Sequence, residues 1–202
     1  PKLNPVSYSI MPDRIEAGTY RLAGAATRGK LRITNIVPEH IGSLIDTMKA
    51  MGFVIETGKD WASVSSGSAL KGELVRTLPY PGFPTDLQAP MMALMTTVPG
   101  ISVMVETIFE NRYTHVPELR RLGADITVER DVSIVKGVQK LSGAPVQMSD
   151  LRAGAALVVA GLAAKGTTEI RRIYHSDRGY ERLYDKLTAV GAKIQRLKGG
   201  SV

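Results

Sequence analysis

Three segments of the chain share one order of apolar and polar positions. Each segment opens with an aspartate ahead of an apolar stretch of helical spacing, and a glycine closes that stretch. The aspartates are Asp13, Asp86 and Asp150, and the glycines are Gly29, Gly100 and Gly166. Because glycine readily adopts the left-handed conformation that ends a helix, the pattern predicts one helix in each segment.

Each predicted helix is followed by the same succession of shorter elements. Alternating stretches at 30–34, 101–105 and 167–171 predict strands, and a second helix is expected to close at Gly52, Gly123 and Gly191. Further strands are predicted at 54–56, 125–128 and 193–196, and at 61–64 and 132–135. The chain is therefore predicted to be one domain, 1–202, with internal repeats at about 12–67, 84–137 and 148–198.

The repeats also predict how the chain packs. One unit cannot bury both faces of its sheet, so three units are expected to pack their helices together around a shared axis. The segment 151–164 is apolar on nearly every side, as expected of an innermost helix, and Met91, Met92 and Met95 have the spacing of core residues. The predicted fold class is α/β (α+β).

Composition excludes several kinds of site and location. The 202 residues include no Cys, which excludes disulfides, thiolate metal sites and a cysteine nucleophile within this chain. Three scattered His make a metal site unexpected. The longest apolar run is too short to span a bilayer. The chain begins without Met and shows no signal or transit pattern, so we expect a truncated or processed, soluble, cytoplasmic protein.

The charge allows anionic partners, and the repeats suggest where they bind. The chain has 26 Lys plus Arg against 19 Asp plus Glu, a formal net charge of +7. Twelve residues after the first glycine of each unit stand Ile41, Arg112 and Arg178. Two arginines in register suit a doubly anionic ligand, although each arginine could instead pair with a neighbouring acid on a solvated helix end.

The three aspartates also allow two interpretations. An aspartate ahead of an apolar helix is a strong N-cap signal, and capping alone would explain Asp13, Asp86 and Asp150. A carboxylate beside several arginines keeps its charge and could orient or deprotonate a hydroxyl. Asp86 has the more unusual setting, because the segment 79–85 before it contains three prolines and a glycine. A stiff loop that holds a carboxylate at the start of a helix is more typical of a site than of a connector.

Several longer strings of residues resemble a known family. They are PDRIE (12–16), FPTD (83–86), ETIFENR (106–112), HVPEL (115–119), KLSGA (140–144) and DRGYE (177–181). From 12 to 198 the chain resembles the C-terminal half of the UDP-N-acetylglucosamine 1-carboxyvinyltransferases, which are enolpyruvyl transferases. The resemblance implies a two-domain inside-out α/β barrel, with three similar subdomains in each domain. It also implies transfer of the enolpyruvyl group of phosphoenolpyruvate to the 3-hydroxyl of UDP-N-acetylglucosamine, the first committed step of peptidoglycan synthesis.

The resemblance also assigns residues to the site. It implies that Asp86 contacts the sugar hydroxyl and is the candidate base, and that Ile108 touches the nucleotide sugar through its backbone. It places Arg112, Arg152 and Arg178 on the phosphoenolpyruvate side, with Asp150 assisting nearby and Arg178 counted among the catalytic residues. No cofactor and no metal are implied.

The family's other domain supplies further substrate-binding residues and a loop with the proton donor, Cys or Asp. None of that half is in this chain, so we expect the N-terminal domain of the enzyme as a partner and little turnover without it. Two alternatives stay open: an enzyme like 5-enolpyruvylshikimate-3-phosphate synthase, and a module that binds a nucleotide sugar without chemistry. Nucleic acid is not expected as a partner, because the basic residues are spread and aromatic residues are few.

Overall fold

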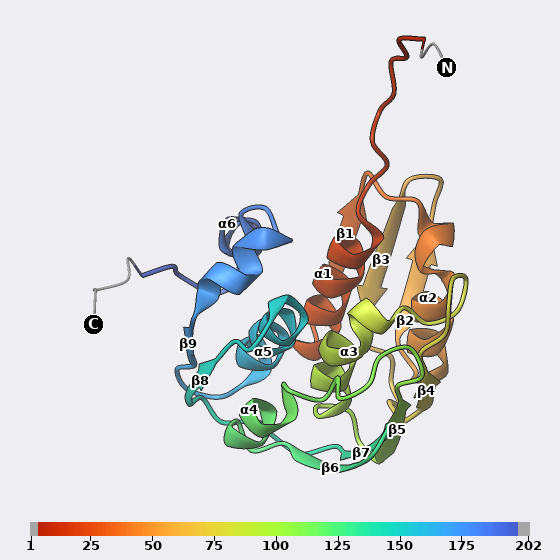
Figure 1. Cartoon of the computed structure of the whole chain (residues 1–202). Helices are drawn as coiled ribbons and strands as arrows, with labels where there is room; N and C mark the ends of the chain where they lie inside the picture. The colour runs from red at the N-terminus through yellow and green to blue at the C-terminus, as the bar shows by residue number, and fades with distance from the viewer. Residues whose placement is uncertain (1–3, 198–202) are drawn as a thin grey trace.

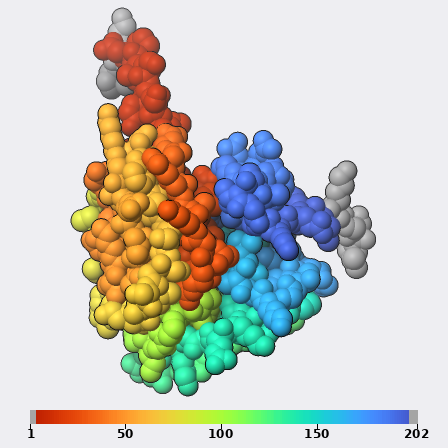
Figure 2. All heavy atoms as spheres, turned by 180° about the vertical axis from the view of Figure 1, so that it is seen from behind, coloured from red at the N-terminus to blue at the C-terminus, as the bar shows by residue number. Residues whose placement is uncertain are grey.

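The computed structural model describes residues 4–197 of the chain (Figure 1). Residues 4–13 form an extended and largely exposed segment that projects away from the body of the molecule (Figures 1 and 2). The remaining residues form three groups of helices and strands. The last residue of the third predicted repeat, Lys198, lies outside the described residues.

The three groups follow one another along the chain. The first contains α1 (Arg14–Ala26), β1 (Leu31–Thr34), η1 (Pro38–Ile41), α2 (Gly42–Ala50), β2 (Val54–Thr57) and β3 (Trp61–Ser65). The second contains β4 (Leu74–Arg76), η2 (Thr85–Leu87), α3 (Gln88–Met95), β5 (Ile101–Val105), α4 (Val116–Arg121), β6 (Asp125–Glu129) and β7 (Val132–Lys136). The third contains β8 (Pro145–Gln147), α5 (Leu151–Ala163), β9 (Glu169–Arg171), η3 (Ile173–Arg178) and α6 (Leu183–Ala189). Among these described elements, no helix has the length and apolar character that crossing a bilayer requires.

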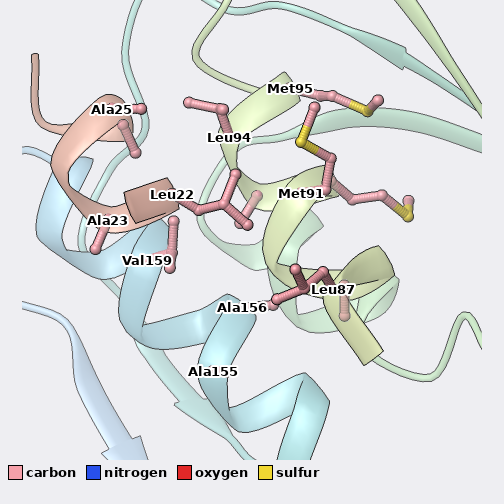
Figure 3. Packing of buried hydrophobic residues seen from close by; sticks show 14 of the residues in the cluster. Leu22, Ala23, Ala25, Leu87, Met91, Leu94, Met95, Ala155, Ala156 and Val159 are labelled. Atoms are coloured by element: carbon pink, nitrogen blue, oxygen red, sulfur yellow. The ribbon is translucent and has the colours of Figure 1, made fainter. Parts of the chain in front are cut away.

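The core lies where α1, α3 and α5 pack against one another (Figure 1). Every residue of α3 is buried, including the three predicted core methionines, and eight consecutive residues of α5 are buried. Figure 3 shows Leu22 of α1 pointing toward α3, while Ala156 of α5 faces Leu87. Small residues on α5 allow this close approach, and burial of the large side chains around them supplies the main stabilisation. The prediction of an innermost apolar helix at 151–164 is therefore confirmed.

Three separate sheets lie outside these helices (Figure 1). The first has the antiparallel order β1-β3-β2, and the second has the order β4-β5-β7-β6, in which β4 and β5 are parallel. The third contains the parallel pair β8 and β9. Helices inside and sheets outside agree with the α/β class and with the inside-out arrangement that the resemblance implies. Within residues 4–197 the three sheets stay separate.

Three strand predictions need correction. The strand predicted at 193–196 is absent, because residues 192–197 form no regular structure and pair with neither β8 nor β9. An alternating stretch becomes a strand only where a neighbouring strand takes up its hydrogen bonds. The sequence analysis also missed β4 and β8. Each has three residues with only the middle one buried, which is too short to show an alternation.

The second glycine of each unit stands at a helix end as predicted: Gly52, Gly123 and Gly191 directly follow the C-caps of α2, α4 and α6 with φ of +95°, +90° and +97°. The first glycines lie beyond the helices that they were predicted to close, because α3 ends at Met95 and α5 at Ala163, ahead of the left-handed Gly100 and Gly166. After α1 the left-handed residue is Arg28, with φ of +57°, and not Gly29. The Arg28 guanidinium donates to the carbonyl oxygens of Ala25 and Thr97, so its side chain helps to hold this turn.

Replacing Arg21 with Met is expected to stabilise the chain. Arg21 on α1 is fully buried, and none of its three guanidinium nitrogens has a hydrogen-bond partner among the described residues. Burial lowers the pKa of Arg21 to about 10. An unpaired buried charge is costly, so the apolar replacement should raise the free energy of unfolding by about 1–3 kcal/mol in urea denaturation. The matched control is Arg76→Met on the exposed face of β4, where little change is expected. A lower stability of Arg21→Met would contradict this account.

Candidate active site

A closed loop brings Asp86 to the beginning of α3. The N–H of Leu78 donates to the carbonyl of Phe83 at 3.0 Å, and the N–H of Gly82 donates to the carbonyl of Pro79 at 2.8 Å. The Phe83 side chain is buried and anchors the far end of the loop. The chain then turns directly into η2, where Asp86 is the second residue, and continues as α3. These contacts agree with the stiff loop that the sequence predicts.

Asp86 lies between two arginines from distant parts of the chain. Arg112 Nη2 donates to Asp86 Oδ1 at 2.7 Å, and Arg152 Nη2 donates to Oδ2 at 2.8 Å. Arg112 follows β5, whereas Arg152 lies in the first turn of α5, so the second and third groups of elements meet at this carboxylate. The Asp86 side chain keeps 37% of its surface exposed. A ligand from solvent can therefore reach the cluster of Asp86, Arg112 and Arg152.

The cluster has the charge and the donors to bind an anion. Two guanidinium groups face one carboxylate, and each uses a single nitrogen for that contact. A guanidinium carries five N–H donors, so each arginine has donors beyond the one that meets Asp86, although Arg152 also shares a hydrogen bond with the Tyr180 hydroxyl. Arg112 also lies over the Phe109 ring, with its Cζ 4.6 Å from the ring centroid, which fixes its direction. A small anion with several oxygens suits this arrangement.

The three aspartates divide between the two interpretations that the sequence leaves open. Asp13 accepts hydrogen bonds from the N–H groups of Ile15 and Glu16, so it caps α1. Asp150 caps α5 in the same way, by accepting from the N–H groups of Arg152 and Ala153. Asp86 makes no side-chain cap in η2, and both of its oxygens face arginines instead. Geometry thus separates Asp86 from its two counterparts.

The surroundings of Asp150 hold its carboxylate in one orientation. Burial acts to raise its pKa, but hydrogen bonds from the N–H groups of Ala153 and Arg152 and from the hydroxyls of Ser149 and Thr114 outweigh burial and lower the pKa. Both oxygens are engaged, one by the helix N–H groups and the other by the two hydroxyls. Asp150 therefore stays ionised and orients the first turn of α5, which carries Arg152.

Ile108 lies in an exposed turn after β5, close to the cluster along the chain. Its side chain is 38% exposed, and that of the adjacent Phe109 is 55% exposed. The N–H groups of both residues donate to Oε1 of Glu106, at 2.9 and 3.1 Å. Since the Ile108 N–H is already used, a backbone contact from Ile108 to a ligand would have to come from its carbonyl oxygen.

Arg178 is not brought into direct contact with the cluster. It is the exposed last residue of η3 and forms no ion pair within the described part of the chain. Its neighbour Gly179 packs so closely on α5 that a Cβ there would lie 2.6 Å from Leu151 Cδ2. η3 thus rests beside the turn that carries Arg152. The arginine that meets Asp86 beside Arg112 is Arg152. That Arg112 and Arg178 share one site stays a prediction.

Two polar residues near the site were missed in the sequence analysis. Tyr180, after η3, is 3% exposed, and its hydroxyl lies 2.9 Å from Thr19 Oγ1 of α1, so it joins the first and third groups. Burial raises the pKa of Tyr180. Glu106 at the end of β5 is also 3% exposed. The repeat register could have revealed Glu106, because Asn35 and Arg172 stand at the same distance after Gly29 and Gly166.

His115 beside this region is expected to make the fold sensitive to acid. It is 1% exposed, and burial, with a smaller contribution from the charge of Arg112, lowers its pKa to about 4 despite the opposing charge of Asp150. Between its ordinary pKa of 6.5 and about 4, only the unfolded chain takes up the proton. The contribution of neutral His115 to the free energy of unfolding should therefore be present in full above pH 6.5. It should fall by up to about 3 kcal/mol as the pH approaches 4. His115→Leu should flatten the pH dependence of urea unfolding between pH 6.5 and 4. An unaltered slope in His115→Leu would contradict this assignment.

Metal ligands do not gather at the site. Over residues 4–197, no group of three or more His, Cys, Asp or Glu side chains is placed to hold a metal ion. The groups that the described residues do bring together are one carboxylate, two guanidinium groups and several hydroxyls. These groups can bind an anion and accept a proton from a hydroxyl that lies beside it.

Comparison with known proteins shows the same family in sequence and in fold. The family model described as EPSP synthase (3-phosphoshikimate 1-carboxyvinyltransferase) matches residues 1–187. A UDP-N-acetylglucosamine 1-carboxyvinyltransferase from Desulfosudis oleivorans is 54% identical over 98% of this chain and 47% of its own length. One from Bdellovibrio bacteriovorus is 55% identical over 98% of this chain and 48% of its length. The chain thus spans about half the length of these curated relatives.

Solved structures agree with this assignment. The enolpyruvyl transferase NikO from Streptomyces tendae superposes with a TM-score of 0.83 at 28% identity, over 92% of this chain and 44% of that protein. An EPSP synthase from Acinetobacter baumannii shares the fold at a TM-score of 0.60 and 19% identity, over 81% of this chain and 40% of that protein. Because the family model covers most of the sequence and the fold agrees, the chain belongs to the EPSP synthase family of enolpyruvyl transferases.

Proposed function

We propose that the protein transfers the enolpyruvyl group of phosphoenolpyruvate to the 3-hydroxyl of UDP-N-acetylglucosamine and releases inorganic phosphate. The observation that carries this proposal is the Asp86 carboxylate held between Arg112 and Arg152 at an open helix start. Such a site offers an anion clamp and a proton acceptor within reach of each other. The names of the relatives that are 54% and 55% identical supply UDP-N-acetylglucosamine and the carboxyvinyl (enolpyruvyl) group, and phosphoenolpyruvate is the donor that the family resemblance implies.

The reaction needs these two functions together. The hydroxyl oxygen of the sugar forms a bond to C2 of phosphoenolpyruvate, and its proton passes to Asp86. C3 gains a proton in this addition and loses one in the elimination, in which the bond between C2 and the phosphate oxygen breaks. Arg112 and Arg152 stabilise the negative charge of the carboxylate and phosphate groups throughout. Arg178, beside the first turn of α5, is proposed to complete the anion side, and the Ile108 carbonyl to contact the nucleotide sugar.

Turnover is proposed to require the part of the relatives that this chain does not match, as the N-terminal domain of a two-domain enzyme. The described residues supply a base and anion contacts, but they leave 37% of the Asp86 side chain exposed to solvent. Proton transfer and charge stabilisation are far more effective when water is excluded. We propose a cytoplasmic enzyme of peptidoglycan synthesis, in keeping with the substrates.

The test is to join this chain to the half of the Desulfosudis oleivorans relative that it does not match, which we call the reconstituted enzyme. Phosphate release is measured with phosphoenolpyruvate and either UDP-N-acetylglucosamine or shikimate 3-phosphate. Release with the nucleotide sugar supports the proposal. Release only with shikimate 3-phosphate would favour the second candidate, which the description of the family model also suggests. Binding of the nucleotide sugar without release in either case would indicate a module without chemistry.

A further inference from the structure

Glu106 is a buried carboxylate without a cationic partner. It lies at the carboxyl end of β5 and is 3% exposed, and none of the ion pairs within residues 4–197 involves it. A buried carboxylate is costly unless hydrogen bonds replace its lost water. The position departs from the internal repeat, in which the other two units carry Asn35 and Arg172. A costly residue at one of three equivalent positions calls for a local purpose.

Four hydrogen bonds satisfy this carboxylate, and they come from three separate segments. Oε1 accepts from the hydroxyl of Thr77 at 2.9 Å and from the N–H groups of Ile108 and Phe109. Oε2 accepts from the hydroxyl of Thr85 at 2.9 Å. Thr77 follows β4, Thr85 begins η2, and Ile108 lies in the turn after β5. One side chain thus ties together the three segments that border the cluster.

Each of these ties acts on a group that the proposed reaction uses. Thr85 directly precedes Asp86 in the chain, so the hydrogen bond from Thr85 to Glu106 fixes where the η2 turn places the Asp86 carboxylate. The two N–H groups of the 108–109 turn point inward at Glu106, which leaves the Ile108 carbonyl as the backbone group that can meet a ligand. Thr107 adds two further links to Thr77, through its N–H and its hydroxyl. Glu106 therefore connects the acceptor side of the site with its base.

We infer that Glu106 is a positioning residue that sets the base Asp86 and the nucleotide-sugar turn at Ile108 in a fixed relation. Its carboxylate touches neither substrate; it acts through Thr85 on one side and through the backbone of the turn on the other. This inference rests on the proposed function, because it assigns Glu106 to the reaction of that same site. A displacement of about 1 Å between reacting groups can cost about 100-fold in rate, so such a tie has a large effect without contacting substrate.

Three variants of the reconstituted enzyme separate positioning from a purely structural role. Thr85→Val removes only the link to Asp86, and should lower kcat by about tenfold while leaving KM for UDP-N-acetylglucosamine unchanged. Glu106→Ala removes both links, and should lower kcat by about 100-fold and raise that KM. Glu106→Gln retains one oxygen acceptor and the shape of the side chain, so it should restore activity to within about tenfold of the parent. Glu129→Gln, at the exposed end of β6, is the matched control and should behave as the parent.

Thermal melting and amide hydrogen exchange accompany the kinetics. Loss of protection at the Ile108 and Phe109 amides in Glu106→Ala, but not in Glu106→Gln, is expected whether or not the parent turns over. An active parent with unchanged kcat in Thr85→Val and unchanged KM in Glu106→Ala would overturn the inference. If Glu106→Ala does not fold, the kcat of Thr85→Val and the activity of Glu106→Gln test the inference in its place. If the parent is inactive but the Ile108 and Phe109 amides lose protection as expected, the result counts against the proposed function alone. If their protection is unchanged in Glu106→Ala, the inference that Glu106 holds this turn is overturned.

Discussion

Changing Asp86 to Asn is expected to lower phosphate release by the reconstituted enzyme by at least about 100-fold. The amide has the size of the carboxylate but cannot take a proton from the sugar hydroxyl. Its NH2 group would also face one of the two guanidinium groups that now donate to Asp86. Both effects remove transition-state stabilisation, so the loss should fall on kcat more than on KM for either substrate.

The fold should survive this change. Asp86 is 37% exposed and its partners Arg112 and Arg152 are 22% and 20% exposed, so solvent partly screens both ion pairs and each is expected to contribute about 1 kcal/mol to stability. A melting temperature close to that of the parent would therefore show that the lower activity comes from a slower chemical step and not from unfolding. Asp46→Asn, on the exposed side of α2, is the matched control and should retain full activity. A loss smaller than about tenfold in Asp86→Asn, or about 1.4 kcal/mol of barrier, would exclude a role as base.

Changing Arg152 to Leu is expected to lower kcat/KM for phosphoenolpyruvate by about 100-fold to 1000-fold. Arg152 is 20% exposed, donates to Asp86 Oδ2 and keeps donors for an anion. Burial acts to lower the pKa of Arg152, but the interactions with Asp86 and Tyr180 outweigh burial and hold this pKa above its ordinary value. Arg152→Lys should recover little of the loss, because an ammonium group cannot hold Asp86 and an anion with the same fixed geometry.

The double variant tests whether the two arginines act as one clamp. Arg112 and Arg152 share Asp86, so the effects of Arg112→Leu and Arg152→Leu should not add. KM for UDP-N-acetylglucosamine should change less than KM for phosphoenolpyruvate. Arg171→Leu, on the exposed strand β9 and paired with Glu169, is the matched control. Equal losses in Arg171→Leu and Arg152→Leu would show a general charge effect instead of a clamp.

Several helix boundaries could be predicted because their signals are local. Asp13 and Asp150 cap α1 and α5, the apolar segment of α5 is innermost, and left-handed glycines follow the ends of three helices, Gly52 after α2, Gly123 after α4 and Gly191 after α6. Capping and helix ends depend on residues within one turn of each other. The strands at 74–76 and 145–147 were not predicted, and the strand predicted at 193–196 is absent. Whether so short a segment becomes a strand depends on a partner that is distant in sequence.

The features of the site likewise divide into those that the sequence predicts and those that depend on tertiary packing. The sequence by itself determined that a carboxylate would stand at a stiff loop before an apolar helix, and that arginines in register would favour an anion. Asp86 has the same local signal as Asp13 and Asp150, and only the tertiary structure showed that it does not cap its helix. Arg112 and Arg152 reach it across 26 and 66 residues of sequence. A hydrogen bond between such distant residues depends on how α3 packs against α5 and the turn after β5, and that packing is a property of the whole core.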